Sequence, residues 1–374
     1  MRNALGVPQF VLAVTEQMKK VRLMKKRVNL LFQSDDNFAF MVGVAMSSLL
    51  EHASKDVFYD IYYFALNLSE DSRRKFNALR ERHPEIDYRM TIVDATRFEK
   101  EFVALGVHAH RGSYVTYFKL LLDRYFKDTD VDRIIHVGAD TLITGSLEGL
   151  ADFDFKGAPF AMNWTEKQHE RYHPWRYRAC VAEMIYFNLP EWRTHKCEER
   201  IIRHIKEIGD IYGSKDQGIL NVEFQDEYVQ LPLKYNVYDM ATHMSKGNLL
   251  RYHDAPVYTR EEIFDAIEHP EIIHIARTFL YRPCEEGSLD FNNDLWWGYC
   301  GRSPWAGFKP IPPNPPLGAK EKLFRWLYQH APLGLCDWLY IISRRAFGVY
   351  LYLTHRPRKK VNIGMDTSNA GEGG

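Results

Sequence analysis

From Val28 onward, short runs of β-branched and aromatic residues alternate with segments whose apolar residues recur at helical spacing. Such alternation is typical of an α/β domain with a largely parallel sheet. The expected strands cover residues 28–32, 58–65, 87–93 and 133–137. The helices expected between them cover residues 37–51, a segment capped by Ser69 that ends before Pro84, and residues 114–126. We therefore predict a single α/β sheet flanked by helices.

Composition narrows the class of protein. A chain of 374 residues is too long for one minimal core, so a main domain with an appendage is expected. Lys plus Arg and Asp plus Glu both number 49, so no general basic field points to nucleic acid as a partner. The five cysteines form no Cys-x-x-Cys pair, which favours a reducing compartment. A cytoplasmic location is therefore the expectation.

Shifts in composition divide the chain into five parts. The expected parts are an amphipathic lead-in helix (1–27), the α/β domain (28–300), a proline-rich linker (301–318), a helical appendage (319–360) and a disordered tail (361–374). Prolines stiffen a linker because each ring fixes one backbone dihedral. The linker before the appendage is therefore expected to be semi-rigid.

The appendage interleaves aromatic and basic side chains, among them Trp326, Trp338, Arg344 and Arg345. Such a mixture suits the interface of an anionic membrane. The alternative is a helical hairpin packed on the α/β domain with its charges in solvent. No window holds the roughly 18–20 consecutive apolar residues that span a bilayer, so membrane contact is expected to be peripheral, on the inner face.

Polar side chains follow two of the expected strands. Residues 34–37 come after the first strand, and Asp140 follows the strand at 133–137. Ligands of open α/β sheets bind outside the carboxyl ends of strands, so both positions are candidates for a site. A lone Asp after a strand is more often a turn former or a helix cap, and Asp35 and Asp36 have the same alternative.

Six segments, taken in order, resemble glycosyltransferase family 8, a family of retaining enzymes. They are residues 34–38 with 48–51, 117–120, 137–143 with 145–147, 187–189 with 192–193, 215–221 and 270–274. The resemblance covers about residues 28 to 285 and depends on the ordered occurrence of the motifs rather than on any one of them. It implies a GT-A-like fold, here a Rossmann-type mixed sheet with a C-terminal helical appendage.

The resemblance also implies a reaction. Family members move a hexose from a UDP-sugar to a glycan or glycolipid acceptor with retention of the anomeric configuration. The favoured route is a front-face displacement in which the leaving phosphate helps to deprotonate the acceptor hydroxyl. Positioning and electrostatics then carry most of the catalysis.

Site residues follow from the same resemblance. The implied contacts to the nucleotide are Asp35, Asp36 and Asn37. The implied ligands of Mn²⁺ or Mg²⁺ are Asp140 and His274, and Lys119 would contact the diphosphate or the sugar. Asp216 and Gln217 would line the transferred sugar, with Gln217 steadying an oxocarbenium-like centre.

Three departures from the family pattern bear on activity. Gly138 stands where the family has the first acid of an Asp-x-Asp pair, so metal affinity is expected to fall and Gly138→Asp to raise it. Glu183 lies where the family has an Asn- and Gly-containing segment and offers an oxygen ligand instead. Arg277 or Arg282 would replace a phosphate-binding lysine. The competing interpretations are an inactive relative that binds a nucleotide or a glycan, and a metal-independent enzyme.

Overall fold

The computed structural model describes residues 25–110, 112–165, 179–208, 215–224, 227–253 and 258–354. The expected lead-in helix lies outside these residues except for its last three positions, and Lys26 already belongs to the first strand. The expected tail at 361–374 and the end of the appendage also lie outside them.

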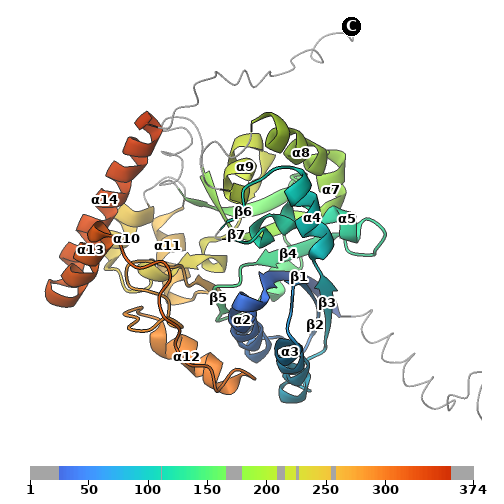
Figure 1. The fold of residues 1–374 in the computed structure, drawn as a ribbon, viewed down its shortest axis with the longest axis horizontal. Coiled ribbons are helices and arrows are strands. Elements are labelled where there is room, and N and C mark those ends of the chain that lie inside the picture. Colours follow the sequence, from blue (N-terminus) through green and yellow to red (C-terminus); the bar gives the residue numbers. More distant parts are fainter. Residues whose placement is uncertain are drawn as a thin grey trace, which may run out of the picture.

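A seven-stranded mixed sheet forms the centre of the molecule (Figure 1), in the order β3-β2-β1-β4-β7-β6-β8. Its strands are β1 (Lys26–Asp35), β2 (Val57–Leu66), β3 (Tyr88–Asp94), β4 (Arg133–Val137), β6 (Phe160–Thr165), β7 (Ala179–Asn188) and β8 (Val229–Gln230). β1 pairs in parallel with β2 and β4, and β2 with β3. β7 runs antiparallel to both β4 and β6. The predicted fold class is confirmed.

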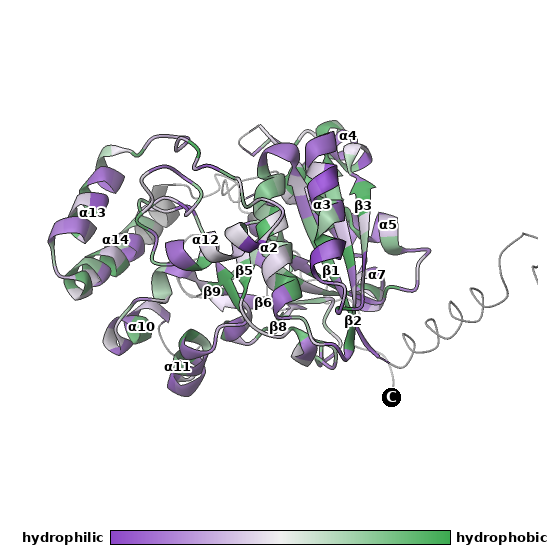
Figure 2. Cartoon of the chain, turned by 90° about the horizontal axis from the view of Figure 1, so that it is seen from below, coloured by the Kyte–Doolittle hydropathy of each residue, from purple (hydrophilic) through white to green (hydrophobic). Residues whose placement is uncertain are grey.

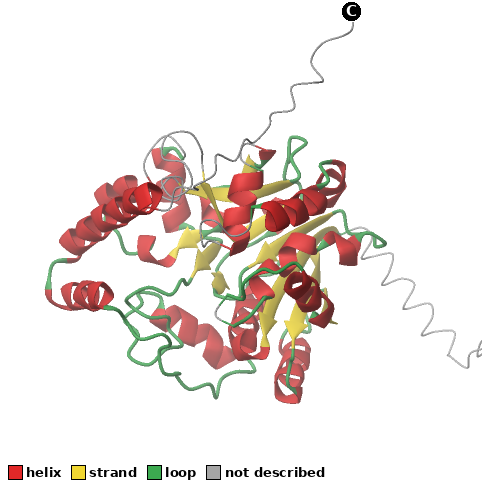
Figure 3. Cartoon of the chain, turned by 45° about the horizontal axis from the view of Figure 1, so that its top comes forward, coloured by secondary structure: helices red, strands yellow, loops and turns green. Residues whose placement is uncertain are grey.

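Alternating side chains along β1 bury both faces of this sheet. Leu30 and Phe32 face one apolar cluster, and Leu31 faces another. Helices α2 (Ala39–Glu51), α3 (Glu70–Arg82) and α12 (Asn293–Arg302) contribute to the first cluster. The second cluster is covered by α4 (Thr96–Ala104), α5 (Asp123–Phe126), α7 (Leu189–Thr194), α8 (Cys197–Glu207) and α9 (Lys215–Glu223). Figure 3 shows these helices on both sides of the strands.

The predicted helix at 114–126 is wrong in kind. The structure has a 3₁₀ helix, η2 (Val115–Leu121), followed by the single α-helical turn of α5. The apolar spacing suggested one buried face, but residues 117–122 are all buried. A segment enclosed on every side carries no amphipathic period, so the spacing could not distinguish the two types of helix.

A second, three-stranded sheet was not predicted from the sequence. It joins β5 (Thr141–Ile143), β10 (Ile272–His274) and β9 (Val237–Tyr238), with β10 in the middle. Helix α2 lies against β5, and the Ser48 hydroxyl accepts a hydrogen bond from the Ile143 amide at 2.9 Å. The antiparallel register sets His274 directly opposite Thr141, one residue after Asp140.

The segment after α12 packs closely on α2. A Cβ atom added at Gly43 of α2 would lie 2.2 Å from the Trp305 ring, so only glycine leaves room for this indole. Further along, the Pro315 carbonyl accepts a hydrogen bond from Arg277 at 2.6 Å, and Leu317 is buried. The proline-rich segment therefore runs over the surface of the domain and is anchored to it at several points.

The appendage forms two helices, α13 (Ala319–His330) and α14 (Leu333–Thr354), that pack on the domain. Phe324, Tyr340 and Ile341 join the buried cluster around α10 (Lys246–His253) and α11 (Arg260–Glu268). Both helices carry hydrophobic and hydrophilic residues side by side (Figure 2). Among the described residues, none of the helices is both long enough and apolar enough to cross a membrane.

The remaining 3₁₀ turns lie in the connections: η1 (Asp36–Phe38), η3 (Glu148–Leu150), η5 (Leu233–Tyr235) and η6 (Asp239–Ala241). Of these, η1 lies at the end of β1, where the sequence suggested nucleotide contacts.

His136 on β4 is a buried imidazole, and neither ring nitrogen has a hydrogen-bond partner in the described part of the chain. Burial lowers the pKa of this imidazole far below 6.5, and the positive charge of Lys119 lowers it further. The folded protein keeps His136 neutral, whereas the unfolded chain takes up a proton as the pH falls below 6.5.

We predict that His136→Leu removes this pH-dependent loss of stability. Between pH 7.5 and 5.5, the free energy of unfolding should shift in favour of the variant, relative to the wild type, by about 1.4 kcal/mol. Urea unfolding at the two pH values measures this shift. The exposed His269, changed to Gln, is the control and should show none. If the difference in free energy of unfolding between His136→Leu and the wild type were the same at pH 7.5 and at pH 5.5, His136 would not be held neutral.

Candidate functional site

The turn after β4 is fixed from both ends. Gly138 donates its amide hydrogen to the Glu183 carbonyl on β7 at 2.9 Å, and its own carbonyl accepts from the Thr141 hydroxyl at 2.9 Å. The Asp140 carbonyl accepts from the Ile275 amide at 2.7 Å, just beyond β10. These bonds hold the Asp140 side chain between the two sheets.

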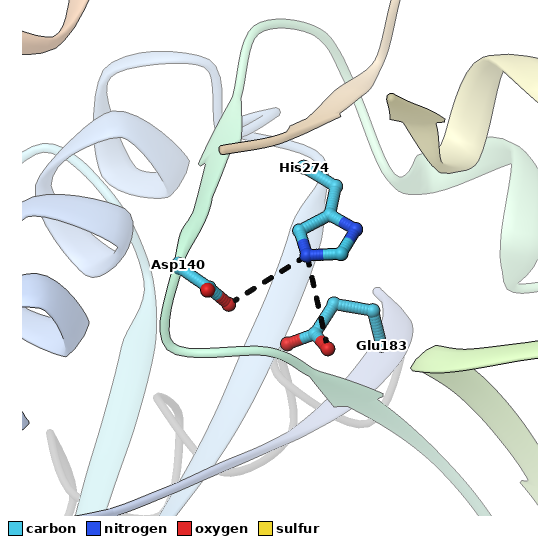
Figure 4. A group of neighbouring side chains, drawn as sticks. All are labelled: Asp140, Glu183 and His274. Atoms are coloured by element: carbon cyan, nitrogen blue, oxygen red, sulfur yellow. Dashed lines mark ion pairs between the residues drawn. The ribbon is translucent and has the colours of Figure 1, made fainter. Parts of the chain in front are cut away.

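Three side chains converge there (Figure 4): Asp140 from the turn after β4, Glu183 from β7 and His274 from β10. His274 Nε2 lies 3.9 Å from Asp140 Oδ1 and 3.9 Å from Glu183 Oε2. One ligand atom from each residue lies within 4.8 Å of the other two. Two carboxylates and an imidazole at this spacing match the donors that Mn²⁺ accepts, and the carboxylates suit Mg²⁺.

The two carboxyl groups titrate in opposite directions. Burial raises the pKa of Glu183 far above its usual range, and the negative charge of Asp140 raises it further. Burial also acts to raise the pKa of Asp140, but the Arg282 guanidinium, followed by His274, holds it well below its usual range. Burial lowers the pKa of His274 as well. Without a cation, the site therefore favours ionisation of Asp140 over ionisation of Glu183.

The two candidate arginines have different neighbours. Arg282 forms an ion pair with Asp140 Oδ2, and its guanidinium lies 5.6 Å from the centre of the Phe38 ring. Arg277 instead pairs with Glu285 at 2.8 Å and donates to the Pro315 carbonyl. The guanidinium that reaches the converging acids is therefore that of Arg282, which also links the turn after β4 to the end of β1.

The three candidate nucleotide contacts at the end of β1 differ in their surroundings. Asn37 is exposed, and Asp35 Oδ1 is buried without a hydrogen-bond partner among the described residues. Asp36 Oδ1 accepts from the amide and the hydroxyl of Ser69 at 3.0 and 3.1 Å. Asp36 therefore anchors the start of α3, and Asp35 and Asn37 retain polar atoms for a ligand.

Lys119, Asp216 and Gln217 meet beside β7. The buried Lys119 ammonium lies 2.7 Å from Asp216 Oδ2 and donates to the Ala182 carbonyl at 3.0 Å. Gln217 accepts from the Ala182 amide at 3.4 Å. Lys119 and Gln217 thus bind the backbone of Ala182, the residue just before Glu183, and Asp216 is held there through Lys119. The ion pair of Lys119 with Asp216 was not foreseen, because it joins segments far apart in the sequence.

One aromatic neighbour of the site was also missed. Tyr238, at the end of β9, meets His274 edge to face at a centroid distance of 5.7 Å. Its other side lies near Arg344 of α14, whose guanidinium is 5.6 Å from the ring centre. Periodicity could not predict this contact, because β9 is only two residues long.

Comparison with known proteins identifies the family. The family model described as glycosyl transferase family 8 matches residues 29–274, about two thirds of the chain. This chain belongs to glycosyl transferase family 8. The family predicted from the ordered motifs is confirmed.

Several glycosyltransferases are similar to this family 8 member. The chain is 21% identical to the glycosyltransferase GlyF of Streptococcus pneumoniae. This match covers 73% of the present chain and 61% of GlyF. It is 22% identical to the lipopolysaccharide glucosyltransferase WaaO of Escherichia coli, covering 82% of this chain and 87% of WaaO. The galactosyltransferase LgtC, solved with donor and acceptor sugar analogues, matches with a TM-score of 0.58 at 18% identity, over 79% of this chain and 99% of LgtC.

Proposed function

We propose that this family 8 protein transfers a hexose from a UDP-sugar to a glycan or glycolipid acceptor, with retention of the anomeric configuration. The observation that carries the proposal is the convergence of Asp140, His274 and Arg282 beside the group of Lys119, Asp216 and Gln217. A cation site next to a polar wall is what a nucleotide diphosphate and its sugar require. The names of the relatives, which include a glucosyltransferase and a galactosyltransferase, support the same class of reaction.

Each group has a part in the proposed reaction. Asp140 Oδ1 and His274 Nε2 would hold the divalent cation, whose charge offsets that developing on the leaving diphosphate. Arg282 offers further N–H donors to the phosphates. Asp35 and Asn37 would bind the nucleotide. These groups together would hold the diphosphate of the donor beside Gln217 of α9.

The chemical step needs little from protein acids and bases. The acceptor oxygen bonds to the anomeric carbon on the face from which the bond to the diphosphate oxygen breaks, and the acceptor proton passes to that diphosphate. Gln217 would lie beside the transferred sugar and steady the positive charge at its anomeric carbon. Lys119 pairs with Asp216 and binds the Ala182 carbonyl, which would fix Asp216 in the wall of the sugar site. Such a site acts mainly by positioning and electrostatics.

The binding of UDP separates this proposal from its two alternatives. We predict that isothermal titration of the full chain with UDP gives measurable affinity only when Mn²⁺ is present, because the buried carboxylates and the diphosphate need a shared cation. Equal affinity without the metal would favour an enzyme that uses Arg282 on the phosphates. Absence of binding in both titrations would favour a non-catalytic relative that binds a glycan as a partner.

Turnover tests the assigned residues. In a screen of UDP-sugar hydrolysis, we expect Asp140→Ala to lower the rate by on the order of 100-fold or more, since transition-state charge would lose its cation. Gln217→Ala should lower the rate by about 10- to 100-fold, with a smaller change in the affinity for UDP. The exposed Asp152, changed to Ala, is the control. Unchanged rates in both variants would contradict the site assignment.

We also propose that the protein is cytoplasmic and contacts the inner face of a membrane peripherally, through α13 and α14. Such a contact would bring the site close to a glycolipid acceptor in that membrane. Large apolar side chains stay exposed on this pair: Leu323, Trp326, Leu333, Leu335, Trp338, Ile342, Phe347 and Tyr350. Such a concentration is typical of an interaction surface.

Two of the basic side chains expected at the membrane, Arg344 and Arg345, bind the domain instead, and the basic residues at 356–360 lie outside the described part of the chain. Arg344 is directed at Tyr252 and Tyr340, whose hydroxyls lie 3.3 and 3.1 Å from its Nη1. Arg345 donates to the Arg251 carbonyl at 2.9 Å. Both guanidinium groups therefore fasten α14 to the domain, and the proposed membrane contact rests on the apolar side chains.

Removal of two exposed tryptophans tests this contact. We predict that Trp326→Ser with Trp338→Ser lowers binding to vesicles of mixed neutral and anionic lipid at least about tenfold, since burial of one large apolar side chain contributes about 1.5–3 kcal/mol. Flotation of vesicles with the full chain measures the bound fraction. The matched control is Val103→Ser on α4, where the side chain is 52% exposed. Equal binding of the double variant and the wild type would exclude this surface as the lipid contact.

A further inference from the structure

Gly138 and Glu183 are neighbours across two antiparallel strands. Val137 of β4 pairs with Met184 of β7, and the next step along the ladder is the 2.9 Å bond from the Gly138 amide to the Glu183 carbonyl. Side chains of such cross-strand neighbours share the same space on one face of the sheet. The residue types at the two positions are therefore coupled by sterics.

Glu183 fills the space that a side chain at position 138 would use. A Cβ atom added to Gly138 would lie 1.8 Å from Glu183 Oε1, 2.5 Å from Cδ and 2.8 Å from Cγ. The backbone of Gly138 is outside the left-handed region, so its conformation does not require glycine. Glycine at this position leaves the space in which the Glu183 carboxylate lies, and a larger residue would require Glu183 to move.

A second glycine and glutamate pair shows what is particular to this one. At Gly145, a Cβ would lie 1.8 Å from Glu271 Oε2, but Glu271 reaches the ammonium of Lys234 at 3.2 Å. In the described part of the chain, Glu183 forms no ion pair with a lysine or an arginine, although the charge of Lys119 acts on it, and its ion-pair partner is His274. A partly buried carboxylate whose ion-pair partner is an imidazole gains from a cation that joins it.

We propose that Glu183 supplies, from β7, the carboxylate that position 138 lacks, so that Asp140, Glu183 and His274 hold one divalent cation. The inference rests on the donor site proposed above. Two carboxylates and an imidazole give the ion the same charge as an Asp-x-Asp pair with histidine would. Arg282 keeps Asp140 Oδ2, which leaves Asp140 Oδ1, 3.9 Å from His274 Nε2, free for the ion.

This assignment reverses the expectation for Gly138→Asp. We expect an aspartate at position 138 to displace the Glu183 carboxylate, because its Cβ would lie 1.8 Å from Glu183 Oε1, so that one acid replaces the other. Positions 138 and 183 therefore have room for a single acid, which can come either from the end of β4 or from β7. An acid at position 138 should become useful only after the side chain at position 183 has been shortened.

The test is titration of the full chain with Mn²⁺ in the presence of UDP. Binding is measured by calorimetry and by the loss of the electron paramagnetic resonance signal of free Mn²⁺. We expect Glu183→Gln and Glu183→Ala each to weaken Mn²⁺ binding at least about tenfold, since loss of even an outer-shell partner costs 10- to 100-fold. Gly138→Asp alone should bind Mn²⁺ more weakly than the wild type. Gly138→Asp combined with Glu183→Ala should recover at least about tenfold over Glu183→Ala alone.

A matched control removes another buried acid far from the site. Glu198→Gln on α8 keeps an oxygen for the Asp123 amide and should leave Mn²⁺ affinity unchanged. Thermal unfolding of each variant separates loss of a ligand from loss of the fold. If Glu183→Ala does not fold, Glu183→Gln and the double variant still provide the comparison.

Two results would overturn the inference. Wild-type affinity for Mn²⁺ in Glu183→Gln, together with a loss in Asp140→Asn, would show that Glu183 is not a ligand, and the proposed transferase function would stand. Absence of Mn²⁺ binding to the wild type would reject the cation site itself. Loss of Mn²⁺ binding in Glu183→Gln without any binding of UDP would instead support the cation site and refute the proposed function.

Discussion

The antiparallel pairing of β5 with β10 is the constraint on which the candidate site depends. Asp140 and His274 are separated by more than a hundred residues, and closure of so long a loop carries an entropy cost that the pairing must offset. The three-residue register that sets His274 opposite Thr141 is short, but α2 supports β5 from behind through Ser48. Packing of α2 against β5 thus stabilises the geometry of the site at a distance from it.

Around this pairing, several ionisable side chains lie together in a largely buried site. Asp140, Glu183, His274 and Arg282 lie within one group, and Lys119 and Asp216 form a buried ion pair next to it. Buried charges contribute little to stability even when paired, because each loses its hydration. Their arrangement is therefore better explained by a charged ligand than by folding.

The sequence predicted the parts of this structure that have strong local patterns. The long strands β1, β2 and β3 and the capped helix α3 were found from periodicity and from Ser69, and Asp140 and His274 were named from ordered motifs. Strands β5 and β9 were missed because two or three residues carry no period. The pairing of Lys119 with Asp216, and the distinction between Arg277 and Arg282, depend on contacts between distant segments and left no trace in spacing.

Trp305 has a consequence for how the molecule can be divided. The residues that match the family end at 274, yet the indole that fills the notch at Gly43 in α2 comes from beyond that point. A chain that ended with the family match would leave a hole the size of an indole against α2, the helix that supports β5. The segment after α12 therefore belongs to the same core as α2, and a fragment limited to the family match would lack part of that core.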